Sequence, residues 1–114
     1  MQVTNNHSLR ADLSLALSYI LSNLGILSEA LEYGKRSLDI HIPLNDRVGL
    51  AKDYKNIGNV LGNMGKIQEA IESHNKALEI DKELNDRVGL AGNYYNISFV
   101  LSETSKDQAI KISL

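Results

Sequence analysis

Apolar residues in the middle of the chain recur every three or four positions, which is the spacing of an amphipathic helix. One such run follows Asp46 and a second follows Gly65. Asp46 is expected to cap the first helix, because its carboxylate can accept from the free amides of a first turn. Gly65 is expected to end that helix. The pattern therefore predicts a pair of helices, and nowhere does it alternate long enough to indicate a strand.

The same pattern returns with a period of 40 residues. The octapeptide at 44–51, LNDRVGLA, reappears unchanged at 84–91, and a shift of 40 also aligns Gly25 with Gly65 and Ala30 with Ala70. A fixed period of this size is typical of stacked units that cannot bury their apolar faces alone. We divide the chain into a lead-in over 1–9, repeat 1 over 10–44, repeat 2 over 45–84 and a truncated repeat 3 over 85–114.

Two positions are expected to interrupt helices. Pro43, the single proline, stands at the junction of repeats 1 and 2, where a helix must stop. Ser105 stands where repeat 2 has Gly65, and the residues after it match the start of a second helix with a slip of one residue. Repeat 3 is therefore expected to be a third helix pair whose last helix has about two turns.

Composition narrows the classes of function. The 14 acidic and 12 basic residues are spread along the 114-residue chain, so the basic surface of a nucleic-acid binder is missing. The absence of cysteine excludes disulfides and thiolate metal sites. The apolar stretch at 13–27 is too short and too polar to cross a bilayer, and the repeat explains it better than a signal peptide does. We expect a cytoplasmic protein without nucleic-acid or membrane partners.

One stretch of repeat 2 carries a family resemblance. Tyr54-x2-Ile57-Gly58-x2-Leu61, then Gly65, then Ala70-x3-His74 and Ala77, resembles the tetratricopeptide pattern W-x2-L-G-x2-Y, A-x3-F. Lys82 stands where that pattern usually has a proline. The period of 40 with its Asn-Asp-Arg junction is similar to the subtype found in kinesin light chains, Pins-like polarity adaptors and many microbial signalling proteins.

The resemblance implies an all-α fold of tandem helix-turn-helix repeats, wound into a right-handed α-solenoid or superhelix. It also implies that the first helices line a concave groove, which holds a peptide or helix of a partner protein. The expected function is that of a non-enzymatic protein-protein interaction scaffold. Because repeat 3 is truncated, we expect the chain to be a fragment of a larger adaptor or signalling protein.

Candidate peptide-binding residues lie on the helical face beside the core positions, which is the groove side in this family. They are Lys52, Lys55, Asn59, Asn63, Tyr95, Asn96 and Phe99. Their counterparts in repeat 1 include Asp12, Leu15 and Tyr19. Asparagine amides can bond both backbone groups of an extended peptide, and aromatic residues are frequent interface anchors. The alternative is that these are solvated surface residues.

A sharper hypothesis is that Lys55, Asn59 and Asn96 resemble the clamp with which some tetratricopeptide domains hold the C-terminal carboxylate of chaperones. The match is incomplete, because the other basic residues of that clamp have no counterpart here. We find no catalytic constellation and expect neither an enzyme nor a cofactor. His7, His41 and His74 occupy unrelated places in their units, so no metal site is expected.

The competing hypothesis is a self-assembling structural module. The end of repeat 3 lacks a polar capping helix, so its apolar residues are expected to pair with the same end of another chain. These residues are Leu101, Ile110, Ile112 and Leu114.

Overall fold

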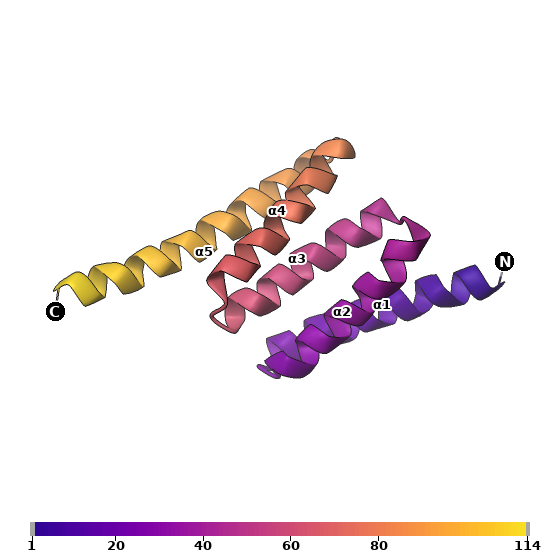
Figure 1. Ribbon diagram of the computed structural model, residues 1–114, viewed down its shortest axis with the longest axis horizontal. Coiled ribbons are helices and arrows are strands. Elements are labelled where there is room, and N and C mark those ends of the chain that lie inside the picture. The colour runs from indigo at the N-terminus through magenta and orange to yellow at the C-terminus, as the bar shows by residue number, and fades with distance from the viewer. Residues whose placement is uncertain (1, 114) are drawn as a thin grey trace.

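The computed structural model describes the backbone of residues 2–113 and the side chains of residues 6–87 and 89–102. Residues 2–113 form five α-helices and no strand. These helices are α1 (Gln2–Asn23), α2 (Leu27–Leu44), α3 (Arg47–Asn63), α4 (Ile67–Glu83) and α5 (Arg87–Ser113). Consecutive helices run antiparallel, so α1 with α2 and α3 with α4 form hairpins that stand side by side (Figure 1). The expected all-α repeat architecture is confirmed.

The four turns between helices share one geometry. Each contains a residue in the left-handed region, where the backbone favours glycine or asparagine. These residues are Gly25, Asn45, Gly65 and Asn85, with φ of 81°, 50°, 80° and 55°. After both asparagines comes a capping aspartate: Asp46 Oδ1 accepts from the amide of Gly49, and Asp86 Oδ1 from that of Gly89, each at 3.0 Å. The predicted Asp46 cap is thus confirmed.

The structure refines two expectations about helix ends, and a third was wrong. Pro43 lies inside the last turn of α2, which ends at Leu44, so the left-handed Asn45 reverses the chain rather than the proline. Helix α1 starts at Gln2, so residues 2–9 of the lead-in are helical, and the division of the chain into lead-in and repeats stays a prediction. Repeat 3 is one helix rather than a pair, because α5 continues past Ser105 to Ser113. Serine does not favour the left-handed conformation that Gly65 adopts, so the helix has no residue suited to turning there.

The core lies between α2, α3 and α4. Leu50, Ala51 and Ile80 form one buried cluster, and Ile57, Leu61 and Ala70 form another. Leu38 of α2 packs against both clusters and so joins repeat 1 to repeat 2. None of the helices formed by the described residues is long and apolar enough to cross a membrane.

Candidate functional site

A groove of about 620 Å³ lies between α1 and α3, the first helices of repeats 1 and 2. We call it the α1–α3 groove. Three of the predicted site residues line it from α3 and three of their predicted counterparts line it from α1. Its complete lining is Asp12, Leu15, Ala16, Tyr19, Ile20, Lys52, Lys55, Asn56 and Asn59.

Buried polar contacts hold the two walls of this groove together. Asn56 Nδ2 donates to Ser18 Oγ at 2.7 Å, and Ser18 Oγ donates to the carbonyl of Ala30 at 2.6 Å. The helices can approach this closely because Gly34 has no side chain: a β-carbon there would lie 3.1 Å from Asn56 Nδ2. Since buried polar groups need partners, this chain of bonds sets the distance between α1, α2 and α3.

The electrostatics of the groove differ between its two lysines. Lys55 Nζ lies 2.9 Å from the buried carboxylate of Asp81, which also accepts from Asn93 Nδ2 at 2.6 Å. A ligand carboxylate at Lys55 would therefore compete with Asp81, which weakens the chaperone-clamp hypothesis. Lys52 is exposed on the same wall, one turn away. Lys52 is thus the lysine whose charge remains available to a ligand.

The remaining predicted site residues do not join the α1–α3 groove. Asn96 and Phe99 line a smaller hollow of about 90 Å³ between α3 and α5, to which Asn59 also contributes. Tyr95 is exposed and stacks on Phe99 with ring centroids 6.5 Å apart. Asn63 lines neither space, since its amide donates to Ser22 Oγ of α1 at 3.2 Å.

Sequence reasoning missed three residues of the α1–α3 groove: Ala16, Ile20 and Asn56. Asn56 lies four residues after Lys52 and three before Asn59, so helical spacing could have identified it as a neighbour of that face. Ile20 was harder to find, because an apolar residue in an amphipathic pattern is usually assigned to the core. Instead its side chain is exposed beside Tyr19.

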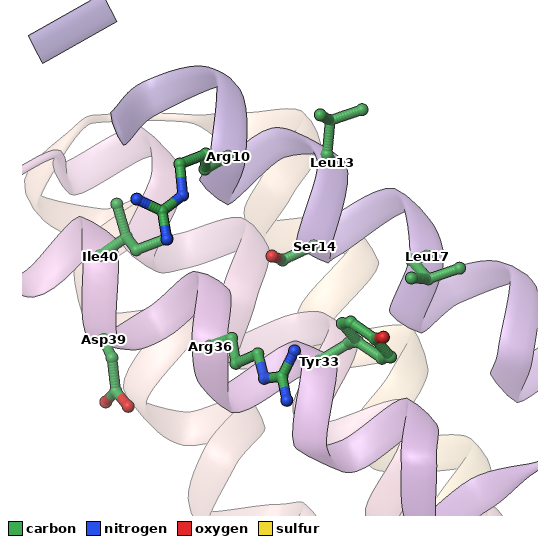
Figure 2. Close-up of a pocket in the computed structure, with 8 residues that line it drawn as sticks. All are labelled: Arg10, Leu13, Ser14, Leu17, Tyr33, Arg36, Asp39 and Ile40. Carbon is green, nitrogen blue, oxygen red and sulfur yellow. The ribbon is translucent and has the colours of Figure 1, made fainter. Parts of the chain in front are cut away.

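A second hollow, which we call the α1–α2 pocket, opens on another face of α1 and has a volume of about 460 Å³ (Figure 2). No site residue was predicted here. Its lining comes from α1 and α2: Arg10, Leu13, Ser14, Leu17, Tyr33, Arg36, Asp39 and Ile40.

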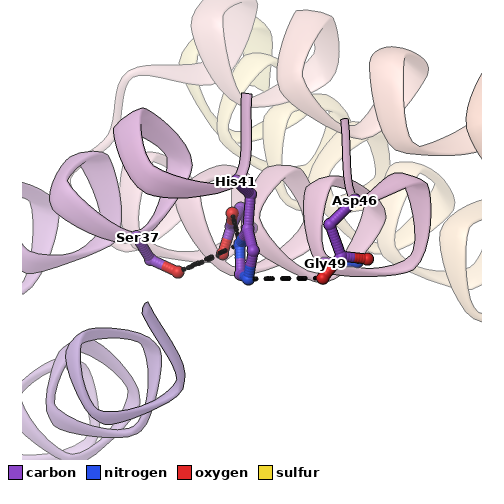
Figure 3. A network of polar contacts seen from close by, with 5 residues as sticks. Ser37, His41, Asp46 and Gly49 are labelled. Atoms are coloured by element: carbon purple, nitrogen blue, oxygen red, sulfur yellow. Dashed lines mark hydrogen bonds and ion pairs between the residues drawn. The ribbon is translucent and has the colours of Figure 1, made fainter. Parts of the chain in front are cut away.

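The junction of repeats 1 and 2 contains a buried polar network (Figure 3). Ser37 Oγ donates to Asp53 Oδ1 at 2.6 Å, and His41 Nδ1 lies 2.5 Å from Asp53 Oδ2. Burial raises the pKa of Asp53, although the hydrogen bonds from Ser37 and His41 act in the opposite direction. In a nucleophilic triad the serine and the acid contact different nitrogens of the histidine. Here both lie at Nδ1 and all three side chains are buried, so the network joins α2 to α3 and does not activate the serine.

The histidines do not form a metal site. No group of three or more potential ligands is close enough to hold a metal ion among the residues whose side chains are described. His74 is fully buried against Gly58, and neither of its ring nitrogens has a hydrogen-bond partner in the described part of the chain. Burial lowers the pKa of His74, and the positive charge of Lys55 lowers it further.

Comparison with known proteins identifies the repeat. A family model described as tetratricopeptide repeat matches residues 9–83, which cover repeat 1 and all but the last residue of repeat 2. A search of curated proteins gave no match. Because the matched segment spans well over half of the chain and includes most of the two helix hairpins, the chain belongs to the tetratricopeptide repeat family.

Proposed function

We propose that the chain is a protein-protein interaction scaffold that binds a peptide or helix of a partner protein in the α1–α3 groove. Tetratricopeptide repeats generally mediate contacts between proteins, and this is the basis of the proposal. As an interaction module it would act within a larger adaptor or signalling protein, in an intracellular setting.

The observation that carries the proposal is the mixture of groups in the groove. Tyr19 and Ile20 expose apolar surface on the α1 wall, while Lys52 and Asn59 offer hydrogen-bond donors on the α3 wall. Concave sites of this composition bind ligands through apolar contact and use a few polar groups to fix orientation. The preferred ligand is therefore a peptide with an apolar side chain for α1 and a carboxylate or backbone carbonyls for α3.

The stacked pair Tyr95 and Phe99 extends the binding surface in this proposal. Together with Asn96 they line or border the hollow between α3 and α5, which Asn59 connects to the α1–α3 groove. A peptide long enough to leave the groove would meet this second set. Lys55 would serve mainly to hold Asp81, and Asn63 to hold Ser22.

A peptide-library screen on the whole chain tests the proposal. For the selected peptides, Asn59→Ala and Lys52→Ala should each weaken binding about tenfold, the loss expected for one good polar contact. Asn75→Ala and Lys66→Ala are matched controls, because both residues are exposed and lie outside the α1–α3 groove. If no peptide binds, or if the controls weaken binding equally, the groove is not the site.

Self-assembly through the C-terminal end is the alternative. Leu101 is exposed on α5, whereas the side chains of Ile110, Ile112 and Leu114 lie outside the described residues. An apolar residue at the end of a repeat array can pair with a second copy. Light scattering of Leu101→Asp beside the wild type distinguishes this alternative, since only self-assembly through that end would respond to the substitution.

A further inference from the structure

Helix α1 carries an apolar stripe that nothing covers within the described part of the chain. Leu9, Leu13 and Leu17 follow one another at intervals of four, and their side chains are 57%, 61% and 37% exposed. Ile20 and Leu24 are exposed as well. At 3.6 residues per turn, the four of these positions that lie in α1 fall within about 80° of the helix circumference, and Leu24 follows just after the end of α1. We call Leu9, Leu13 and Leu17 the leucine stripe, and such a face usually marks an interaction site.

The 40-residue repeat shows what normally covers this face. The counterparts of the stripe on α3 are Gly49, Asp53 and Ile57, and all three are buried. Helix α2 covers them: a β-carbon on Gly49 would lie 2.6 Å from the ring of His41, and Asp53 bonds to Ser37 and His41. The same face is therefore an established interface in repeat 2.

The junction between α4 and α5 repeats this arrangement. Gly89 and Asn93 of α5 occupy the equivalent positions and are buried. Asp81 of α4 covers both, since its carboxylate accepts from Asn93 and would lie 2.6 Å from a β-carbon on Gly89. At both junctions, therefore, a helix covers the face that corresponds to the leucine stripe: α2 covers it on α3, and α4 covers it on α5.

The α1–α2 pocket beside the stripe is the place that a side chain of such a helix would fill. Its counterpart in repeat 2 lies beside Leu50 and Ile80, and Leu38 of α2 packs against the buried cluster that these two residues form with Ala51. In repeat 1 these two positions are Arg10 and Ile40, which border the pocket in Figure 2. The pocket is thus the unfilled equivalent of the Leu38 site.

We propose that the leucine stripe and the α1–α2 pocket dock an amphipathic helix of a partner protein, packed as α2 packs on α3. The docked helix places a leucine in the pocket, as Leu38 does in repeat 2. Leu13 defines a further requirement, because it replaces the polar Asp53 and Asn93 of the internal junctions. A polar residue at the position of His41 or Asp81 would be buried against Leu13 without a partner. The docked helix therefore has an apolar residue there.

The test uses two labelled peptides that copy residues 27–45 of this chain, one with the native sequence and one with His41→Leu. The full-length protein is titrated into each peptide and binding is followed by fluorescence anisotropy. The His41→Leu peptide should bind the wild type with micromolar affinity and at least tenfold more tightly than the native peptide does. The Leu13→Asp protein should instead bind the native peptide more tightly. The introduced carboxylate would face His41 of that peptide, as Asp53 faces His41 within the folded chain.

A matched control separates this effect from a general loss of apolar surface. Ile42 on α2 is 52% exposed and lies outside the stripe and the pocket, so Ile42→Asp should leave both affinities unchanged. Leu38→Ala in the His41→Leu peptide should weaken binding at least tenfold, because the pocket would stay empty. Circular dichroism before titration establishes that each variant is folded.

Three results would overturn the proposal. Neither peptide binds the wild type, or Leu13→Asp weakens both peptides alike, or light scattering gives a wild-type dimer that Leu13→Asp converts to a monomer. In the last case a second copy of the chain occupies the stripe instead of a partner helix. These results are independent of the α1–α3 groove, because the stripe residues do not line it.

Discussion

At the scale of single residues, His74 is the least satisfied group in the described core. Its ring is fully buried and neither nitrogen has a partner, while the family pattern has an aromatic residue at this position. Burial disfavours the charged form of the imidazole and so lowers the pKa of His74 below its ordinary 6.5. The unfolded chain, by contrast, protonates at the ordinary value.

This difference predicts how stability depends on pH. The contribution from neutral His74 is complete above pH 6.5 and is lost as the pH falls toward the lowered pKa, by up to about 1.4 kcal/mol per pH unit. His74→Phe should remove that loss and should be at least as stable as the wild type near neutrality. Urea unfolding at about pH 7.5 and about pH 5.5 measures both effects. Parallel pH dependence in the two proteins would contradict the assignment to His74.

The ring of His74 also explains why position 58 has no side chain. A β-carbon on Gly58 would lie 2.7 to 2.8 Å from three atoms of the His74 ring, whereas one on Gly62 would make only ordinary contacts at 3.7 and 4.0 Å. Gly58→Ala should therefore destabilise the protein by about 1 to 3 kcal/mol through overpacking. Gly62→Ala, one turn away on α3, should be neutral or stabilising by up to about 1 kcal/mol, because alanine favours the helix. Equal melting temperatures for the two variants would show that the contact with His74 is not tight.

At the scale of helices, the two junctions between repeats use different buried polar groups at equivalent positions. His41 with Asp53 joins α2 to α3, and Asp81 with Asn93 joins α4 to α5, with Lys55 added at the second junction. Each pair is complementary within its own junction, and exchanging members between junctions would set Asp81 against Asp53. We interpret this difference as a device that favours the correct pairing of helices, at the cost of desolvating the charged groups.

A double-mutant cycle tests that interpretation. His41→Leu and Asp53→Leu should each destabilise the protein by about 3 kcal/mol, because each leaves a buried polar partner unpaired. The double variant should lose clearly less than the sum, with a coupling of about 1 to 3 kcal/mol, since the two leucines can pack on each other. Additive losses in chemical unfolding would mean that the two residues act separately.

The helices themselves were predictable from the sequence, while their ends and their contacts were only partly so. The period of 40 and the turn residues placed α2, α3 and α4 and the end of α1, because local capping and turn residues determine those boundaries, whereas the start of α1 at Gln2 was missed. The continuity of α5 was missed, since alignment with Gly65 suggested a turn that Ser105 does not support. The contact between His41 and Asp53 was also missed. The shift of 40 aligns these residues with Asp81 and Asn93, which are polar as well. The sequence does not show, however, that the two side chains of each pair meet between neighbouring helices.

The α1–α3 groove was predicted in part for a related reason. Helical spacing identifies which residues share a face, so Lys52, Lys55 and Asn59 were placed together and the structure has them on one wall. Spacing says nothing about which polar groups are already paired. The bonds from Lys55 to Asp81 and from Asn63 to Ser22 depend on how neighbouring helices are set, which the pattern within one helix does not determine.

At the scale of the whole molecule, the chain is elongated. Its radius of gyration is 15.2 Å, against about 13 Å for a compact domain of this length, and its extents are 61 × 32 × 18 Å. A repeat array of this kind has two open ends in place of one closed core. In the present chain the leucine stripe lies at one end, and α5 with the exposed Leu101 lies at the other.

From the surfaces at these two ends we expect the protein to be a monomer in solution. The leucine stripe fits a helix equivalent to α2, and in each copy the corresponding faces of α2 and α4 are already covered by α3 and α5. A second copy therefore has no free surface of the matching kind among the described residues. Light scattering coupled to size exclusion should give a mass near 12.6 kDa at micromolar concentrations. A mass that rises with concentration would contradict this, and Leu13→Asp beside Leu101→Asp would then identify the end through which the copies associate.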